Sequence, residues 1–151
     1  PMGTPIEAKV VTLTFIQNSD SGLYLQQRYN TGFMDGCFDV PSGKVDQGET
    51  LTQSAQRELF EEAGVLVAEA DLECFHAYLN TANEGSPFIG FMFRAAKWRG
   101  SPKNKEPQKC AQAGFIGLDE ADNLRLTPMV RDGISKLAIA SSIELGYYGL
   151  K

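Results

Sequence analysis

The sequence is poor in the residues that build zinc sites and disulfide frameworks. It contains a single histidine, His76, and only three cysteines, Cys37, Cys74 and Cys110, with no CxxC pair among them. Structural zinc sites need several Cys or His ligands at short spacings, and disulfide-stabilised domains carry dense, even-numbered cysteines. We therefore expect reduced thiols in a cytoplasmic protein, neither a zinc site nor a disulfide, and a structural role for the histidine.

Long apolar runs and an excess of positive charge are also missing. No stretch is long and apolar enough to span a membrane, and no signal-peptide pattern opens the chain. The 14 Lys and Arg residues are outnumbered by 19 Asp and Glu residues, which gives a net charge of −5. Such a charge is unsuited to binding duplex DNA or RNA. We expect no membrane and no nucleic acid polymer as partner, and the oligomeric state stays open.

Short runs of β-branched or alternating apolar residues predict the strands. They span residues 8–16, 23–28, 38–40, 65–68, 72–79, 88–98 and 113–118. Turn-forming residues separate the first two runs, so these should form a hairpin or lie as neighbouring strands.

The remaining segments predict a loop and two helical elements. Residues 100–109 are polar with two prolines and should form a loop, and residues 118–121 a helical turn. A final helix should begin at Thr127-Pro128, because proline suits the first helical position, and should end at Gly146. Its core-facing stripe is Val130, Ile134, Leu137, Ala138 and Ser141. The sum is one α/β domain over residues 1–151, a mixed sheet with helices on either side.

Residues 43–65 contain the most informative helix. Thr50 can cap its start in a capping box with Gln53, and Gly64 supplies the left-handed residue that ends it. This predicts a helix of about three and a half turns.

Three glutamates, Glu58, Glu61 and Glu62, fall within one arc of this helix. Glu58 and Glu62 repel each other by about 0.2–0.5 kcal/mol. The helix dipole disfavours an anion in the last turn by about 0.3–1 kcal/mol. The ion pair available along the helix, Arg57 with Glu61, has the weaker orientation. A solvated acidic face is the simpler interpretation, but its local cost favours a site for Mg²⁺, or alternatively Mn²⁺, which clustered carboxylates bind.

The spacing around the helix resembles the signature of the Nudix hydrolases of the MutT-like type. Five residues separate Gly43 from Glu49, and seven more lead to Arg57-Glu58, followed by Leu59, Glu61-Glu62, Gly64 and Val65. The resemblance implies an α/β/α sandwich with a mixed β-sheet. It also implies metal-dependent hydrolysis of a phosphoanhydride bond in a nucleoside diphosphate derivative, a small-molecule nucleotide.

The resemblance further implies a metal site and a general base. Glu58, Glu61 and Glu62 would bind the metal together with the backbone carbonyl of Ser42, at a position where the family usually has glycine. A carbonyl ligand does not depend on the side chain. Glu58 could also deprotonate the attacking water, and Glu106 on the 100–109 loop is a second acidic candidate for metal binding or base catalysis.

The resemblance also implies supporting roles for other residues. Glu49 and Arg57 look like the pair that holds a catalytic glutamate in place. Arg28, at the end of a predicted strand, and Gly43 would lie at the substrate. Without the resemblance, Arg28 is simply a surface arginine.

The expected substrate is a nucleoside triphosphate, cleaved to monophosphate and pyrophosphate. Asn80 and Thr81 stand where ADP-ribose hydrolases tend to carry a proline and dinucleoside polyphosphate hydrolases a tyrosine. Surfaces for stacking a base are offered by Phe33, Phe38, Tyr78 and Trp98.

Other functions stay open at this point. One is hydrolysis of ADP-ribose or dinucleoside polyphosphates, and another is a Nudix-fold regulatory module that binds a nucleotide without turnover. A third is an isomerase of the same fold, which would need a catalytic cysteine such as Cys37 or Cys74.

Overall fold

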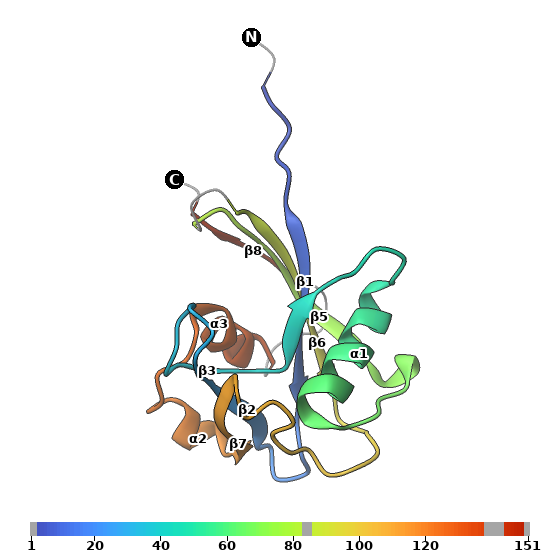
Figure 1. The fold of residues 1–151 in the computed structure, drawn as a ribbon, viewed down its shortest axis with the longest axis vertical. Helices are drawn as coiled ribbons and strands as arrows, with labels where there is room; N and C mark the ends of the chain where they lie inside the picture. Colours follow the sequence, from blue (N-terminus) through green and yellow to red (C-terminus); the bar gives the residue numbers. More distant parts are fainter. Residues whose placement is uncertain (1–2, 83–85, 138–143, 150–151) are drawn as a thin grey trace.

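Two β-sheets form the framework of the computed structural model, which describes residues 3–82, 86–137 and 144–149 (Figure 1). The larger sheet has the order β4-β1-β6-β5-β8, and its strands are β1 (Lys9–Ile16), β4 (Ser42–Lys44), β5 (Glu73–Asn80), β6 (Phe88–Ala95) and β8 (Glu144–Tyr148). β1 runs parallel to β6, and β5 parallel to β8, whereas β4 and β1 and also β5 and β6 are antiparallel. The sheet is therefore mixed, as predicted.

The second sheet of the framework is smaller and antiparallel. Its order is β3-β2-β7, built from β2 (Leu23–Arg28), β3 (Phe38–Asp39) and β7 (Cys110–Ile116). The helical elements are α1 (Leu51–Ala63), the short 3-10 helix η1 (Glu69–Asp71), α2 (Leu118–Ala121) and α3 (Pro128–Leu137). None of the helices in the described ranges is long and apolar enough to cross a membrane.

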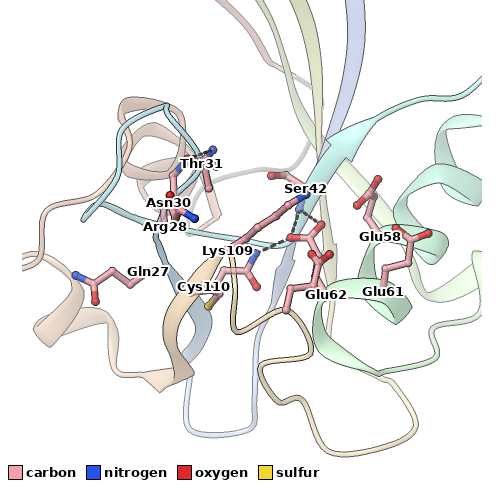
Figure 2. A pocket seen from close by; sticks show the side chains of 12 residues that line it. Gln27, Arg28, Asn30, Thr31, Ser42, Glu58, Glu61, Glu62, Lys109 and Cys110 are labelled. Atoms are coloured by element: carbon pink, nitrogen blue, oxygen red, sulfur yellow. Dashed lines mark hydrogen bonds between the residues drawn. The ribbon is translucent and has the colours of Figure 1, made fainter.

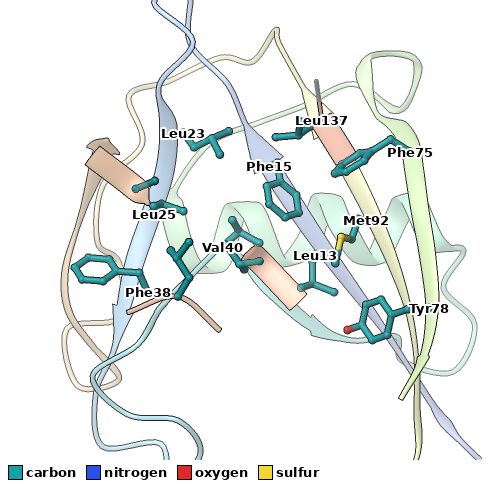
Figure 3. Close-up of a cluster of buried hydrophobic side chains, with 13 residues drawn as sticks. Leu13, Phe15, Leu23, Leu25, Phe38, Val40, Phe75, Tyr78, Met92 and Leu137 are labelled. Atoms are coloured by element: carbon teal, nitrogen blue, oxygen red, sulfur yellow. The ribbon is translucent and has the colours of Figure 1, made fainter. Parts of the chain in front are cut away.

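Alternation of side chains along β1 explains why helices lie on both faces of the large sheet. Leu13 and Phe15 belong to the core cluster that α3 covers, which Figure 3 shows in close-up. Ile16 belongs to a second cluster, together with Leu59 of α1. Successive strand residues point to opposite faces, so a strand with apolar residues on both faces needs a helix on each. The expected α/β/α sandwich is confirmed.

The helix in residues 43–65 forms as predicted. The Thr50 hydroxyl accepts a hydrogen bond from the Gln53 N–H at 3.1 Å, and the Gln53 side chain accepts one from the Thr50 N–H at 3.0 Å. Gly64 ends the helix in the left-handed conformation with φ of 72°. The termini of α1 are thus fixed by local sequence alone.

Three corrections to the strand predictions concern residues 9–68. β1 and β2 are not sheet neighbours, because β1 pairs with β4 and β6 and only one isolated bridge, Gln17 with Leu23, joins the two segments. Residues 65–68 form no strand and make a single bridge, Leu66 with Arg99. The short strand β4, after Pro41, was not predicted.

The predicted end of the last helix is also wrong. The helix α3 ends at Leu137, and Gly146 lies inside strand β8. A Cβ at Gly146 would lie 2.8 Å from the Nε2 atom of His76, so this glycine serves close packing between neighbouring strands and not helix termination. Ala138 and Ser141, two members of the predicted stripe, lie outside the described residues.

Candidate active site

A cavity of about 450 Å³ opens between α1, β2, β4 and the 100–109 loop. Six of the residues singled out in the sequence line it: Arg28, Ser42, Glu58, Glu61, Glu62 and Glu106. Figure 2 shows the three helix glutamates on one side of this glutamate pocket and the β2 residues on the other. The fold therefore brings residues from four separate segments to one place.

Arg57 organises the acidic side chains at the edge of the pocket. Its Nε and Nη2 atoms donate to the two carboxylate oxygens of Glu49 at 2.7 and 3.0 Å, and its Nη1 donates to Glu58 Oε1 at 2.7 Å. The contact with Glu61 is longer, at 3.4 Å. Hydrogen bonds from Arg57 lower the pKa of Glu49. The structure thus brings Glu49 and Arg57 together, and the arginine fixes the orientation of Glu58 as well.

Glu62 is held in the interior by neutral donors. Gln26 Nε2 donates to its Oε1 at 2.6 Å, and the Ser42 N–H donates to its Oε2 at 3.2 Å. Burial, followed by contact with the Glu58 carboxylate, raises the pKa of Glu62 well above its ordinary value. Because two carboxylates side by side in a half-buried pocket repel each other, they favour the binding of either a proton or a metal cation between them.

Gly43 leaves room for Glu58. It lies in β4 opposite Thr12 of β1, and an ideal Cβ there would lie 2.1 Å from Glu58 Oε1. A Cβ at that distance would force the Glu58 carboxylate to move, so the first glycine of the signature has a steric reason in this chain. Gly43 itself borders a neighbouring hollow and not the glutamate pocket.

Arg28 lies between the pocket and this hollow, and its guanidinium is already engaged. It donates to Phe33 O at 2.6 Å, to Asp39 Oδ2 at 3.1 Å and to Thr31 Oγ1 at 3.1 Å. Its Cζ also lies 5.2 Å from the centre of the Phe33 ring. Burial raises the pKa of the Asp39 carboxyl, an effect that Arg28 opposes. Sequence reasoning missed this pairing because eleven positions separate the two residues.

The neighbouring hollow, of about 250 Å³, is partly aromatic. Its lining includes Phe33, Tyr78, Asn80 and Met129, and it shares Arg28 and Ser42 with the glutamate pocket. Of the other two aromatic candidates, Phe38 is buried in the core. Trp98 stacks on Phe115 with 5.8 Å between ring centres and lines a separate hollow near η1. The structure therefore brings Phe33 and Tyr78 to the site and leaves Phe38 and Trp98 away from it.

The 100–109 loop is docked on the C-terminal end of α1. The backbone N–H of Lys103 donates to Ala63 O, and that of Lys105 donates to Glu62 O, at 3.0 and 3.1 Å. Asn104 stiffens the loop by donating to Cys110 O and accepting from the Glu106 N–H. Carbonyl groups that a helix end leaves unpaired are thereby satisfied, and Glu106 is carried to the pocket.

All three cysteines are free thiols, as predicted. Neither Cys37 nor Cys74 lines the glutamate pocket, and burial raises the pKa of the Cys74 thiol. Cys110 does line it, but burial raises its pKa too, which leaves a poor nucleophile. The cysteines give an isomerase mechanism no support.

Comparison with known proteins decides the family. The family model described as NUDIX domain matches residues 8–137. The chain belongs to the Nudix family. This Nudix chain is 35% identical, over 101 residues, to the 8-oxo-dGTP diphosphatase of Haemophilus influenzae, covering 66% of the chain and 71% of that protein. It is 25% identical over 112 residues to the 8-oxo-dGTP diphosphatase of Escherichia coli K12, covering 74% of the chain and 84% of that protein.

A solved structure shares the fold. The MutT NUDIX hydrolase from Burkholderia pseudomallei superposes with a TM-score of 0.76 at 22% identity, over 87% of this chain and 99% of that one. The protein is a MutT-like Nudix hydrolase, an enzyme that cleaves phosphoanhydride bonds in nucleotides.

Nudix hydrolases generally need a divalent metal ion, and the pocket fits one by its donor chemistry. Glu58, Glu61, Glu62 and the Ser42 carbonyl offer only oxygen ligands, which hard cations prefer. Within residues 3–82, 86–137 and 144–149, no three His, Cys, Asp or Glu side chains are already gathered closely enough to hold a metal. The Glu61 side chain is 51% exposed, against 13% for Glu58. A metal ion held by these three glutamates would therefore require their side chains to draw together.

We predict that Gly43→Ala lowers kcat by about 10²-fold, because a methyl group would displace the Glu58 carboxylate from its place beside Arg57. Gly114→Ala is the matched control, since a Cβ at Gly114 meets no atom within 4 Å and the residue lies outside the pocket. Steady-state kinetics on both purified variants measure the effect. Equal activity of the two variants would show that Gly43 has no steric role.

We also predict that Glu62→Gln raises the melting temperature in metal-free buffer at pH 7.5. A carboxyl whose pKa is raised by folding destabilises the protein once pH exceeds its unfolded pKa, and the amide removes that cost while still accepting hydrogen bonds. Each kcal/mol gained corresponds to about 2–4 °C for a domain of this size. Calorimetric scans should show the difference shrinking toward pH 4, where Glu62 is protonated in the wild type.

Magnesium provides the control for this prediction. Millimolar Mg²⁺ should raise the melting temperature of the wild type by mass action and that of Glu62→Gln much less. An equal Mg²⁺-dependent rise in melting temperature for the two proteins would contradict the expectation that Glu62 binds the metal.

Proposed function

We propose that this enzyme hydrolyses a nucleoside triphosphate of the 8-oxo-dGTP type to its monophosphate and pyrophosphate. The observation that carries the proposal is the adjacency of the glutamate pocket and the aromatic hollow, which share Arg28 and Ser42. A polyphosphate chain fits the first and a base the second. The names of the Haemophilus influenzae and Escherichia coli relatives support this substrate.

The proposed reaction places the phosphates over the glutamates. Glu58, Glu61 and Glu62, with the Ser42 carbonyl, would hold Mg²⁺, with Mn²⁺ as a substitute. When bound, such a metal neutralises phosphoryl charge and lowers the pKa of water. These four residues line one wall of the pocket.

The chain's own groups orient the reactants. Arg57 fixes Glu58, the proposed general base, by the 2.7 Å hydrogen bond to its Oε1. Glu106 lines the same pocket and is the second candidate for the base. Arg28 and Gly43 border the place where the phosphates meet the nucleoside.

The aromatic hollow suits a purine with an added carbonyl group. Phe33 and Tyr78 offer ring surfaces, and base stacking on such rings contributes about 1–3 kcal/mol. The side-chain oxygen of Asn80, Oδ1, accepts a hydrogen bond from the Ala82 N–H at 2.9 Å, which leaves the side-chain nitrogen Nδ2 to donate. An oxidised purine presents a matching acceptor.

We predict that Glu61→Gln lowers kcat by at least about 10²-fold, because it removes one charge from the proposed metal site while keeping side-chain size. Its stability should not fall, since like-charge repulsion on α1 is relieved. Glu69→Gln, an exposed acidic residue on η1, serves as control. Near-normal turnover by purified Glu61→Gln would remove Glu61 from the metal site.

Substrate choice is tested by comparing kcat/KM across nucleotides. We expect 8-oxo-dGTP to exceed dGTP, and both to exceed ADP-ribose and a dinucleoside polyphosphate. Chromatographic identification of monophosphate and pyrophosphate completes the assignment. Preference for either of the last two compounds would overturn the substrate proposal, and binding of nucleotides without any product would favour a regulatory module.

A further inference from the structure

Two positively charged side chains of the described residues, Arg28 and Lys109, line the glutamate pocket. They differ in whether their charged groups already have hydrogen-bond or ion-pair partners. The Arg28 guanidinium makes an ion pair with Asp39 and donates to Phe33 O and Thr31 Oγ1. Lys109, the other cation, has no ion-pair or hydrogen-bond partner for its ammonium group among the described residues. The pocket therefore contains one neutralised cation and one available cation.

The backbone of Lys109 is held by hydrogen bonds on both sides. Its N–H donates to Glu106 O at 2.9 Å, and its carbonyl accepts from the Tyr29 N–H at 3.0 Å. The next residue, Cys110, begins β7 and pairs with Arg28 of β2. Figure 2 shows the Lys109 side chain in the pocket, between the β2 residues and the helix glutamates. A flexible stem on an anchored backbone can follow a ligand without moving the loop.

The negative charge of the pocket favours a positively charged group at the place where a polyphosphate would bind. Four carboxylates, those of Glu58, Glu61, Glu62 and Glu106, line the cavity. Bound divalent metal offsets part of this charge, but a polyphosphate adds further negative charge of its own. A lysine ammonium is a compact donor that binds phosphate as a point charge.

We propose that Lys109 is a substrate-binding residue whose ammonium contacts a non-bridging oxygen of the nucleotide's polyphosphate chain. This inference rests on the proposed function. It gives Lys109 the electrostatic contact with substrate, while Arg28 shapes the loop after β2 through Asp39 and Phe33. The sequence alone does not distinguish Lys109 from the other lysines of residues 100–109, because it is the fold that places Lys109 at the pocket.

A neighbouring lysine makes a matched control. Lys103 is exposed on the same loop and carries the same charge, but it does not line the pocket. Lys105 is less suitable because its side-chain carbons pack near Gly64 at the end of α1. Replacing Lys103 or Lys109 by alanine therefore changes net charge equally and differs in one feature, access to the pocket.

The experiment compares Lys109→Ala, Lys109→Arg and Lys103→Ala with the wild type, using 8-oxo-dGTP and dGTP with Mg²⁺. Lys109→Ala should raise KM about 10- to 100-fold, as loss of a charge-assisted hydrogen bond implies, with kcat within a few-fold. Lys109→Arg should recover most of the affinity, and Lys103→Ala should stay within about twofold of wild type. Melting temperatures of all four proteins should agree.

Three results would overturn the inference. They are an unchanged KM in Lys109→Ala, equal losses in Lys109→Ala and Lys103→Ala, or a loss confined to kcat. If the wild type turns over no nucleoside triphosphate, the proposed function fails separately. Calorimetric binding of inorganic triphosphate with Mg²⁺ then decides the role of Lys109: weaker binding by Lys109→Ala alone supports it, and equal binding by all variants refutes it.

Discussion

The contact between the Glu58 and Glu62 carboxylates is the constraint on which the site depends. Both lie on the same side of α1, one helical turn apart, and α1 packs them against β4. Like charges at this distance are unfavourable, and burial increases the cost. The surrounding residues limit that cost: Arg57 pairs with Glu58, and Gln26 and the Ser42 backbone donate to Glu62.

The fold supports this arrangement from two directions. Antiparallel pairing of β4 with β1 places Ser42 and Gly43 beneath the helix, where the glycine leaves the Glu58 carboxylate in its place beside Arg57. The 100–109 loop approaches from the other side and satisfies the last carbonyls of α1. The backbone hydrogen bonds that satisfy these carbonyls also hold the loop that brings Glu106 and Lys109 to the pocket. Structural support and function share these contacts.

Local sequence predicted the parts of the site that depend on near neighbours. The caps of α1 and the shared arc of its glutamates follow from spacings of three and four residues, and both are present. Pairings across the sheets could not be predicted in this way. Gln26 contacts Glu62, although 36 positions separate the two residues. The strand β8 pairs with β5, whereas the apolar stripe of α3 predicted a helix that continued into the residues of β8.

Glu62 also distinguishes an enzyme from a nucleotide-binding module without turnover. Its neighbours, the Gln26 amide and the Ser42 N–H, are donors that a glutamine at position 62 would satisfy through its carbonyl oxygen. A module that only binds nucleotides could therefore replace the carboxylate and avoid the cost of burying its charge. The carboxylate gains an advantage only when a cation shares the pocket. Its presence beside Glu58 thus favours metal-assisted hydrolysis over simple recognition.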